Sequence, residues 1–159
     1  MKQEYYSLKS TIVAIFASIL LSCGNTQNSD NYRINITDPD KDGAPVYKIC
    51  TTIRGTAFIP ASDYLWVLLH RKDLTGQWWP QDGGIVKDNQ FNIRVCFGQP
   101  QDLGMEFEIA VITVGQAEHL VLQNYVKTAR QTGNWYFISI PPVTSPATFR
   151  TIKKTGHQL

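Results

Sequence analysis

Hydrophobic and polar positions alternate over short stretches through most of the chain after Pro45. The alternation is regular over 90–97, whereas 64–69 and 110–114 are apolar at both parities and should be buried on both faces. Pro80 limits the segment 78–81 to the edge of a sheet. Short strands separated by Gly, Pro, Asp and Asn predict an antiparallel β-sandwich, with strands expected over 46–58, 64–72, 78–81, 90–97, 105–114 and 147–153.

One segment departs from this pattern, because its apolar residues recur with the spacing of a helix. Gly133 follows it in the position of a C-terminal cap. An amphipathic helix has to bury its apolar stripe, so we expect this helix, over about 115–131, to pack on the outer face of the sheet that holds 64–69 and 110–114. The residues of the expected stripe are Ala117, Leu120, Val121, Asn124, Tyr125 and Thr128.

The amino-terminal residues 1–23 contain an apolar run from 12 to 21 after a basic start. The run is shorter than the roughly 20 residues of a membrane-spanning helix and has the length of the core of a secretory signal peptide. It ends in Leu20-Leu21-Ser22-Cys23, which resembles the lipobox of bacterial lipoproteins. The resemblance implies that residues 1–22 are a signal peptide and that Cys23 carries diacylglycerol, with a further acyl chain such as palmitate on its amino group.

Lipidation of Cys23 would make a lipid bilayer the first partner of the chain and place it in the cell envelope. The residue after the cysteine is Gly24 rather than aspartate, and by the same resemblance this favours the outer membrane in a bacterium with two membranes. The alternative is an ordinary signal peptide that has a cysteine at this place by chance.

Residues 23–44 are polar, with isolated apolar positions and no sustained period, so we expect a flexible tether followed by one β-sandwich domain over 45–159. Asp38, Asp40 and Asp42 match the opening of an EF-hand calcium loop. The twelfth position of that loop requires a bidentate acid and is occupied by Ile49, so an acidic turn is the preferred interpretation. No metal ion or cofactor is expected.

Two cysteines remain in the exported part of the chain, where the environment is oxidising. Cys50 and Cys96 both fall on the polar parity of their strands. If the two strands are antiparallel neighbours, as the second and fifth strands of immunoglobulin-like sandwiches are, residue 50 lies opposite residue 96 and a disulfide fits. Such a bond would face away from the core. The alternative is two free, half-buried thiols.

The sequence contains no recognisable catalytic set. The three histidines, His70, His119 and His157, stand alone, and there is no nucleophile elbow, phosphate-binding loop or metal-ligand spacing. Glu106 and Glu108 share one strand face, but solvated acids at the start of a strand are the preferred interpretation. A hydrolase that uses Glu106, Glu108 or His70 is therefore the least favoured function, and we do not expect an enzyme.

Composition narrows the choice of ligand. The chain has 15 basic and 13 acidic residues, which gives no reason to expect nucleic acid as a partner. Aromatic residues make up 11% of the chain, and Trp78 and Trp79 are adjacent, so one should point inward and the other outward. A tryptophan exposed beside Gln81, with His70 as a further candidate, suits a sugar ring or a peptide. The alternative is that the pair closes the open end of the sandwich, and Trp66 is expected in the core.

The body of the chain also resembles, in short pieces spread over about 46–154, an uncharacterised bacterial module of immunoglobulin-like type. This resemblance implies interaction rather than catalysis. We therefore expect a membrane-anchored, non-catalytic binding domain of the cell envelope, with a protein or a glycan as its ligand. The alternative is a structural or assembly subunit of an envelope complex. The pieces that carry the resemblance are Arg54-Gly-Thr56, Leu65-Trp-Val67, Trp79-Pro-Gln81, Val95-Cys-Phe97-Gly98, Phe107-Glu-Ile109, Thr132-Gly-Asn134-Trp135 and Pro141-Pro142.

Overall fold

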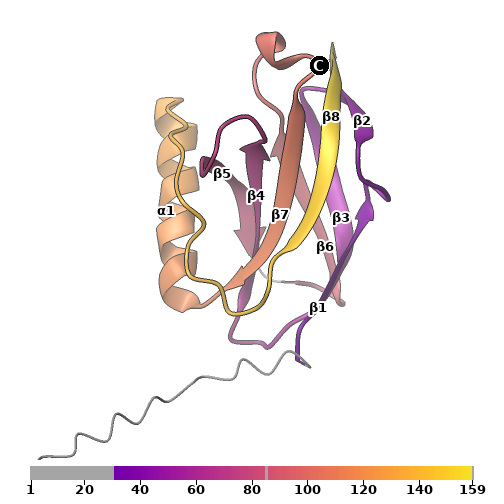
Figure 1. Ribbon diagram of the computed structural model, residues 1–159. Helices are drawn as coiled ribbons and strands as arrows, with labels where there is room; N and C mark the ends of the chain where they lie inside the picture. The colour runs from indigo at the N-terminus through magenta and orange to yellow at the C-terminus, as the bar shows by residue number, and fades with distance from the viewer. Residues whose placement is uncertain (1–30, 85, 159) are drawn as a thin grey trace, which may run out of the picture.

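Two β-sheets face each other in the computed structural model, which describes residues 31–84 and 86–158 (Figure 1). The expected signal peptide, residues 1–22, and Cys23 lie outside the described residues. The smaller sheet has the order β1-β3-β6, with β1 Arg33–Asp38, β3 Cys50–Phe58 and β6 Gln90–Cys96. The larger sheet has the order β2-β8-β7-β4-β5, with β2 Ala44–Lys48, β8 Thr148–Gln158, β7 Glu106–Val114, β4 Tyr64–Arg71 and β5 Trp78–Gly84. The expected β-sandwich is confirmed.

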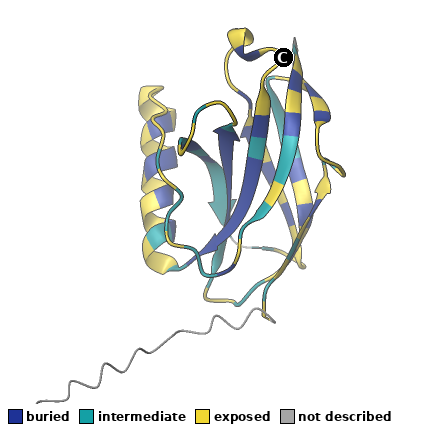
Figure 2. Cartoon of the chain, in the orientation of Figure 1, coloured by how far each residue is buried: buried dark blue, intermediate teal, exposed yellow. Residues whose placement is uncertain are grey.

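The connectivity follows the immunoglobulin pattern. The orders β1-β3-β6 and β8-β7-β4 correspond to the A-B-E and G-F-C orders of immunoglobulin sandwiches. The single strand expected over 46–58 is in fact two strands, because the chain passes from one sheet to the other at Ile49: β2 pairs in parallel with β8, and β3 pairs with β1 and β6. The core between the sheets is built from alternate residues of these strands, and Ile53, Val95 and Ile109 are fully buried in it (Figure 2).

The prediction of a flexible tether was wrong for residues 33–44. Strand β1 pairs with β3 from Arg33↔Phe58 to Asp38↔Arg54, and Ile36 is buried in the core. Ile34 and Ile36 do alternate with polar residues, and Ile34 also packs against the core. The alternation covers only six residues within a polar stretch, so it did not stand out from a solvated linker.

The helix α1 (Gln116–Thr132) covers the outer face of the larger sheet, as expected (Figure 1). Its Leu122 and Val126 pack in one cluster with Trp66 of β4 and Ile112 of β7, and Gly133 ends it in the left-handed conformation. The stripe predicted to be buried was wrong apart from Tyr125. The buried helix residues are His119, Leu122, Tyr125, Val126 and Ala129, whereas Ala117, Leu120, Val121, Asn124 and Thr128 are exposed.

His119 explains part of this difference. Its ring is buried, stacks on Tyr64 with 3.7 Å between ring centroids, and accepts a 3.1 Å hydrogen bond at Nδ1 from the indole N–H of Trp66. Burial lowers the pKa of His119 below its usual value of 6.5, which favours the neutral acceptor form. A residue that counts as polar in the sequence therefore belongs to the packed face.

The disulfide is present in the expected register. Cys50 lies opposite Cys96 in the β3–β6 ladder, and the two sulfurs are bonded. Val95 and Phe97, on either side of Cys96, are buried, whereas Cys96 is exposed. The bond thus lies on the face directed away from the core, as the parity of the two positions predicted.

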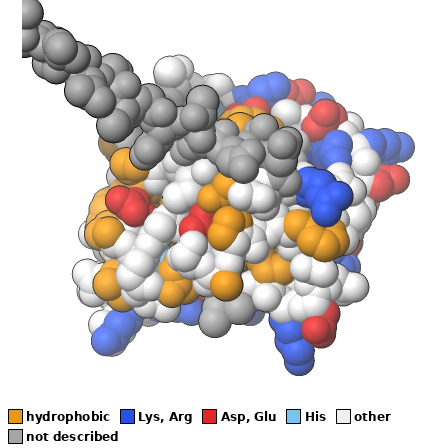
Figure 3. All heavy atoms as spheres, turned by 90° about the horizontal axis from the view of Figure 1, so that it is seen from below, with side chains coloured by type: hydrophobic (Ala, Val, Ile, Leu, Met, Phe, Trp, Pro, Cys, Tyr) orange, Lys and Arg blue, Asp and Glu red, His pale blue; other side chains and the backbone are white. Residues whose placement is uncertain are grey.

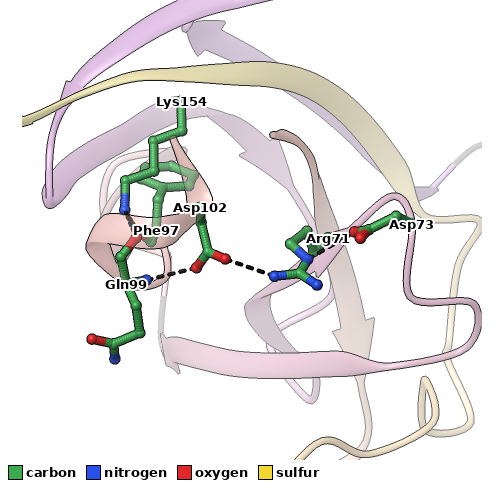
Figure 4. A network of polar contacts seen from close by, with 6 residues as sticks. All are labelled: Arg71, Asp73, Phe97, Gln99, Asp102 and Lys154. Carbon is green, nitrogen blue, oxygen red and sulfur yellow. Dashed lines mark hydrogen bonds and ion pairs between the residues drawn. The ribbon is translucent and has the colours of Figure 1, made fainter. Parts of the chain in front are cut away.

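A polar network lies at the end of the sandwich where β7 begins (Figure 4). The Lys154 ammonium is fully buried and donates to the backbone carbonyls of Phe97 (2.5 Å) and Gln99 (2.7 Å). Burial lowers the pKa of Lys154, and the Asp102 carboxylate opposes that shift. The Asp102 carboxylate in turn accepts hydrogen bonds from the Arg71 guanidinium (2.6 Å) and from the backbone N–H of Gln99 (2.6 Å). Because these groups bind one another, the network is a structural anchor for the turn after β6.

Candidate binding surface at the edge strand β5

Strand β5 lies at one edge of the larger sheet and holds the segment that follows α1. The Trp78 amide donates to the Ile138 carbonyl (2.9 Å), and the Ile138 amide donates to the Trp78 carbonyl (2.8 Å). Pro80 lies two residues further along β5, so its backbone nitrogen, like that of Trp78, is directed away from β4. Proline has no N–H, and at this position the β4–β5 ladder needs none. The edge position expected for Pro80 is confirmed, and it places residues around 138 against the predicted tryptophan pair.

Trp78 is the member of the pair that points inward. It is buried, and its ring stacks on His70 with 4.8 Å between centroids. His70 is itself buried, and its Nδ1 lies 2.9 Å from the Gln77 carbonyl oxygen. His70 is therefore not exposed as the ligand-binding candidate of the sequence analysis has to be, because β5 folds Trp78 over it. Neither side chain is open to a ligand in this structure.

Trp79 points to the other side and is partly exposed. Its ring meets the edge of the exposed Phe137 ring at a centroid distance of 6.4 Å. Gln81 holds this arrangement, because its amide nitrogen donates to the Trp79 carbonyl (3.2 Å) and its amide oxygen accepts from the Cys96 N–H (2.9 Å). Gln81 thus connects the aromatic edge to the disulfide-bonded strand β6, and both ends of its amide are used within the fold.

The larger part of the exposed aromatic area lies in residues that the sequence did not single out. Trp135, Tyr136, Phe137 and Phe149 are 41%, 52%, 54% and 47% exposed. Phe149 lies on β8, and its ring is 6.3 Å from that of the buried Trp78, which points to the opposite side of β5 from Trp79. We call Trp79, Trp135, Tyr136 and Phe137 the aromatic surface. Three consecutive aromatic residues directly after a helix were the signal that could have revealed it.

Tyr125 of α1 fixes the chain beneath this surface. Its hydroxyl donates to the Tyr136 carbonyl (2.5 Å), and its ring makes edge contacts with Trp135 (6.2 Å) and Tyr136 (4.7 Å). Burial raises the pKa of Tyr125 to about 12, so the hydroxyl keeps its proton and remains a donor near neutral pH. The aromatic side chains therefore extend from a backbone that is bonded on one side to α1 and on the other to β5.

Three of the acidic residues named in the sequence analysis, Glu106, Asp38 and Asp42, interact with other residues of the fold. Glu106 pairs with the Lys72 ammonium (3.0 Å), and Glu108 lies opposite His70 in the β4–β7 register. Asp38 pairs with Arg54 (2.7 Å), and the backbone amide of Thr151 holds the pKa of Asp42 below its usual value. Among residues 31–84 and 86–158, no three His, Cys, Asp or Glu residues are placed to hold a metal ion.

Charge does not single out a second site on the end of the molecule seen in Figure 3. There, Lys and Arg side chains are interspersed with Asp and Glu, and neither sign gathers into a patch.

None of the helices in the described part of the chain is long and apolar enough to cross a membrane. No protein-family model matches the chain, and neither does a curated protein or a solved structure.

Proposed function

We propose that this chain is a lipid-anchored, non-catalytic binding domain of the cell envelope whose ligand is held by the aromatic surface. The observation that carries this proposal is the group of three well-exposed aromatic side chains, Trp135, Tyr136 and Phe137, beside the partly exposed Trp79 at the edge of β5. Buried aromatic residues need no ligand to account for them. An exposed group on a backbone that is bonded on both sides is a typical recognition surface.

The chemistry of this surface suits a ligand with flat apolar faces and polar edges. Aromatic rings offer a large contact area at a small cost in side-chain entropy, and the Tyr136 hydroxyl and the indole N–H groups of Trp79 and Trp135 add hydrogen-bond donors. A glycan strand that stacks its sugar rings and an extended peptide of another envelope protein both have these properties. The residues around the rings contribute few charges, so the binding should depend weakly on salt.

The lipobox supports the other half of the proposal. Leu20-Leu21-Ser22-Cys23 places the acylated residue eight positions before Asn31, where the described chain begins. An anchor of two or three acyl chains would keep the domain at the membrane surface. Replacement of Cys23 by serine should move the protein from the membrane fraction to the soluble envelope fraction. Retention of the Cys23→Ser protein in the membrane would contradict the anchor.

A photo-crosslinking experiment tests the surface directly. Benzoylphenylalanine placed at Phe137 in the native lipoprotein should crosslink to one specific envelope component in intact cells, identified by mass spectrometry. Tyr47 is the matched control, because it is an aromatic residue of similar exposure (55%) on β2, at the opposite edge of the larger sheet. Equal crosslinking patterns at positions 137 and 47 would refute the assignment of the ligand to this surface.

Alanine variants separate a glycan from a protein ligand. Each aromatic contact of this kind contributes about 0.5–1.5 kcal/mol beyond the area that it buries, so Trp79→Ala with Phe137→Ala should weaken binding by about tenfold or more. The measurement is co-sedimentation with purified peptidoglycan sacculi and, in parallel, with the crosslinked protein. Tyr47→Ala should bind as the unaltered protein does. Unchanged binding of the double variant to both would refute the proposal.

A further inference from the structure

The first half of α1 presents apolar side chains to solvent. Leu120 is 53% exposed and Val121 is 69% exposed, and Ala117 lies beside them one helical turn earlier. The helix is already satisfied on its other side, where Leu122 and Val126 pack against the sheet. We call Ala117, Leu120 and Val121 the α1 apolar face. It is the first part of the stripe that the sequence pattern predicts to be buried, and the described part of the domain does not cover it.

The position of this face relative to the amino terminus follows from two hydrogen bonds. The Tyr32 hydroxyl donates to Asp63 (2.7 Å), and the hydroxyl of the adjacent Tyr64 donates to Gln116, the first residue of α1 (2.5 Å). The start of α1 and the start of β1 therefore lie at the same end of the sandwich (Figure 1). The α1 apolar face is within the first two turns of the helix, near that end.

The length of chain before this end limits its distance from the membrane. Cys23 is eight residues before Asn31, and eight fully extended residues span at most about 28 Å. If Cys23 carries the acyl chains, this end of the domain stays within roughly that distance of the lipid headgroups. A surface so close to the bilayer meets it at a high effective concentration, so a small contact area is sufficient for docking.

The same end carries a second group of suitable chemistry. Phe58, at the end of β3, is 43% exposed, and the Arg33 guanidinium lies 4.7 Å from the centre of its ring. Aromatic rings prefer the membrane–water interface, and a guanidinium can bind lipid phosphate there. Figure 3, which views the molecule from this end, shows hydrophobic side chains scattered over the visible face, with acidic side chains among them and most Lys and Arg side chains toward the rim.

We propose that this end of the sandwich docks on the lipid bilayer, with Leu120, Val121 and Phe58 at the boundary between headgroups and acyl chains and Arg33 on the lipid phosphates. This inference rests on the proposed lipid anchor. It assigns the exposed helix stripe to a lipid surface and gives the anchored domain a fixed orientation. Because α1 has 17 residues and is about 25 Å long, the aromatic surface that follows its last residue would be held away from the bilayer.

The test uses the acylated, full-length mature protein, reconstituted into vesicles of phosphatidylethanolamine and phosphatidylglycerol. Val121→Cys supplies one reactive thiol, because Cys50 and Cys96 are bonded and Cys23 is acylated. An environment-sensitive nitrobenzoxadiazole label is attached there, and its quenching by doxyl lipids is measured. Asn92→Cys is the matched control, since Asn92 is exposed on β6 of the other sheet. Vesicle flotation is measured on the same samples.

Docking predicts that the label at position 121 is quenched at least threefold more than the label at position 92. Adding Leu120→Asp to the labelled Val121→Cys protein should abolish that difference while the protein still floats with the vesicles. Equal quenching at the two positions, with flotation intact, would overturn the docking and leave the anchor standing. Loss of flotation would overturn the anchor and the docking with it. If the label signal depends on the density of the protein on the vesicles and not on the doxyl lipid, the α1 apolar face binds a second copy of the chain. That outcome would refute the proposal.

Discussion

The turn after β6 is a place where one added methyl group should be costly. Gly98 has φ +48°, and a Cβ built there lies 1.9 Å from Oδ2 of Asp102. That oxygen accepts the hydrogen bond of the Gln99 amide, and the other oxygen of the same carboxylate binds Arg71. In Gly98→Ala the carboxylate has to move, and the Gln99 amide loses its partner.

Two contributions add up in this variant. The left-handed conformation costs a residue with a Cβ about 1–2 kcal/mol. Displacement of the Asp102 carboxylate removes a hydrogen bond to a charged acceptor, which contributes about 1.5–3 kcal/mol. The expected loss of unfolding free energy for Gly98→Ala is therefore about 2.5–5 kcal/mol. Gly133 provides the control, because it has φ +72° but nothing lies within 4 Å of an added Cβ. Gly133→Ala should lose only about 1–2 kcal/mol.

Urea unfolding followed by tryptophan fluorescence measures both losses. The unaltered reference is a Cys23→Ser chain that starts at residue 23, so that no acyl chains interfere. The informative quantity is the difference between the two alanine variants, because the backbone term is common to both. A difference below about 0.5 kcal/mol would mean that the Asp102 carboxylate does not hold the turn as the structure indicates, since the hydrogen bond at risk is larger than that.

Two further predictions concern the disulfide and the buried histidine. Cys50 and Cys96 are 46 residues apart, so replacing both by alanine should lower the unfolding free energy by up to about 4 kcal/mol in the chain-entropy model, and a loss below 1 kcal/mol by urea unfolding would contradict a stabilising bond. Because the pKa of His119 is lowered in the folded state, its contribution to stability is complete above the unfolded value of about 6.5 and is lost as the pH falls through the lower folded-state value. Protonation would also remove the acceptor of the Trp66 indole N–H, so unfolding free energies measured from pH 7.5 to pH 4.5 should fall more steeply for the unaltered protein than for His119→Gln. Identical slopes would be the contrary outcome.

The candidate site was only partly predictable. The parity rule for adjacent residues correctly separated the buried Trp78 from the partly exposed Trp79. It said nothing of Phe137, because the contact between Trp79 and Phe137 joins residues 58 positions apart through a β-bridge at Ile138. Gln81 was expected to face a ligand, and the structure uses its amide to join two strands.

Local pattern by itself determined strands β4, β6 and β7 and the cysteine register, because side chains alternate with a strict period of two along a strand, and it also determined the presence and end of the helix. The tertiary structure decided between alternatives that the local sequence pattern does not distinguish. The alternation of strand β1 is only six residues long, and it is pairing with β3 that buries Ile36 and makes this segment part of the sandwich. The helix has two stripes that could pack, and the one that packs on the sheet contains Leu122 and Val126 together with His119, whose ring accepts a hydrogen bond from Trp66. Burial depends on which surfaces meet, and a stretch of sequence does not specify its partner.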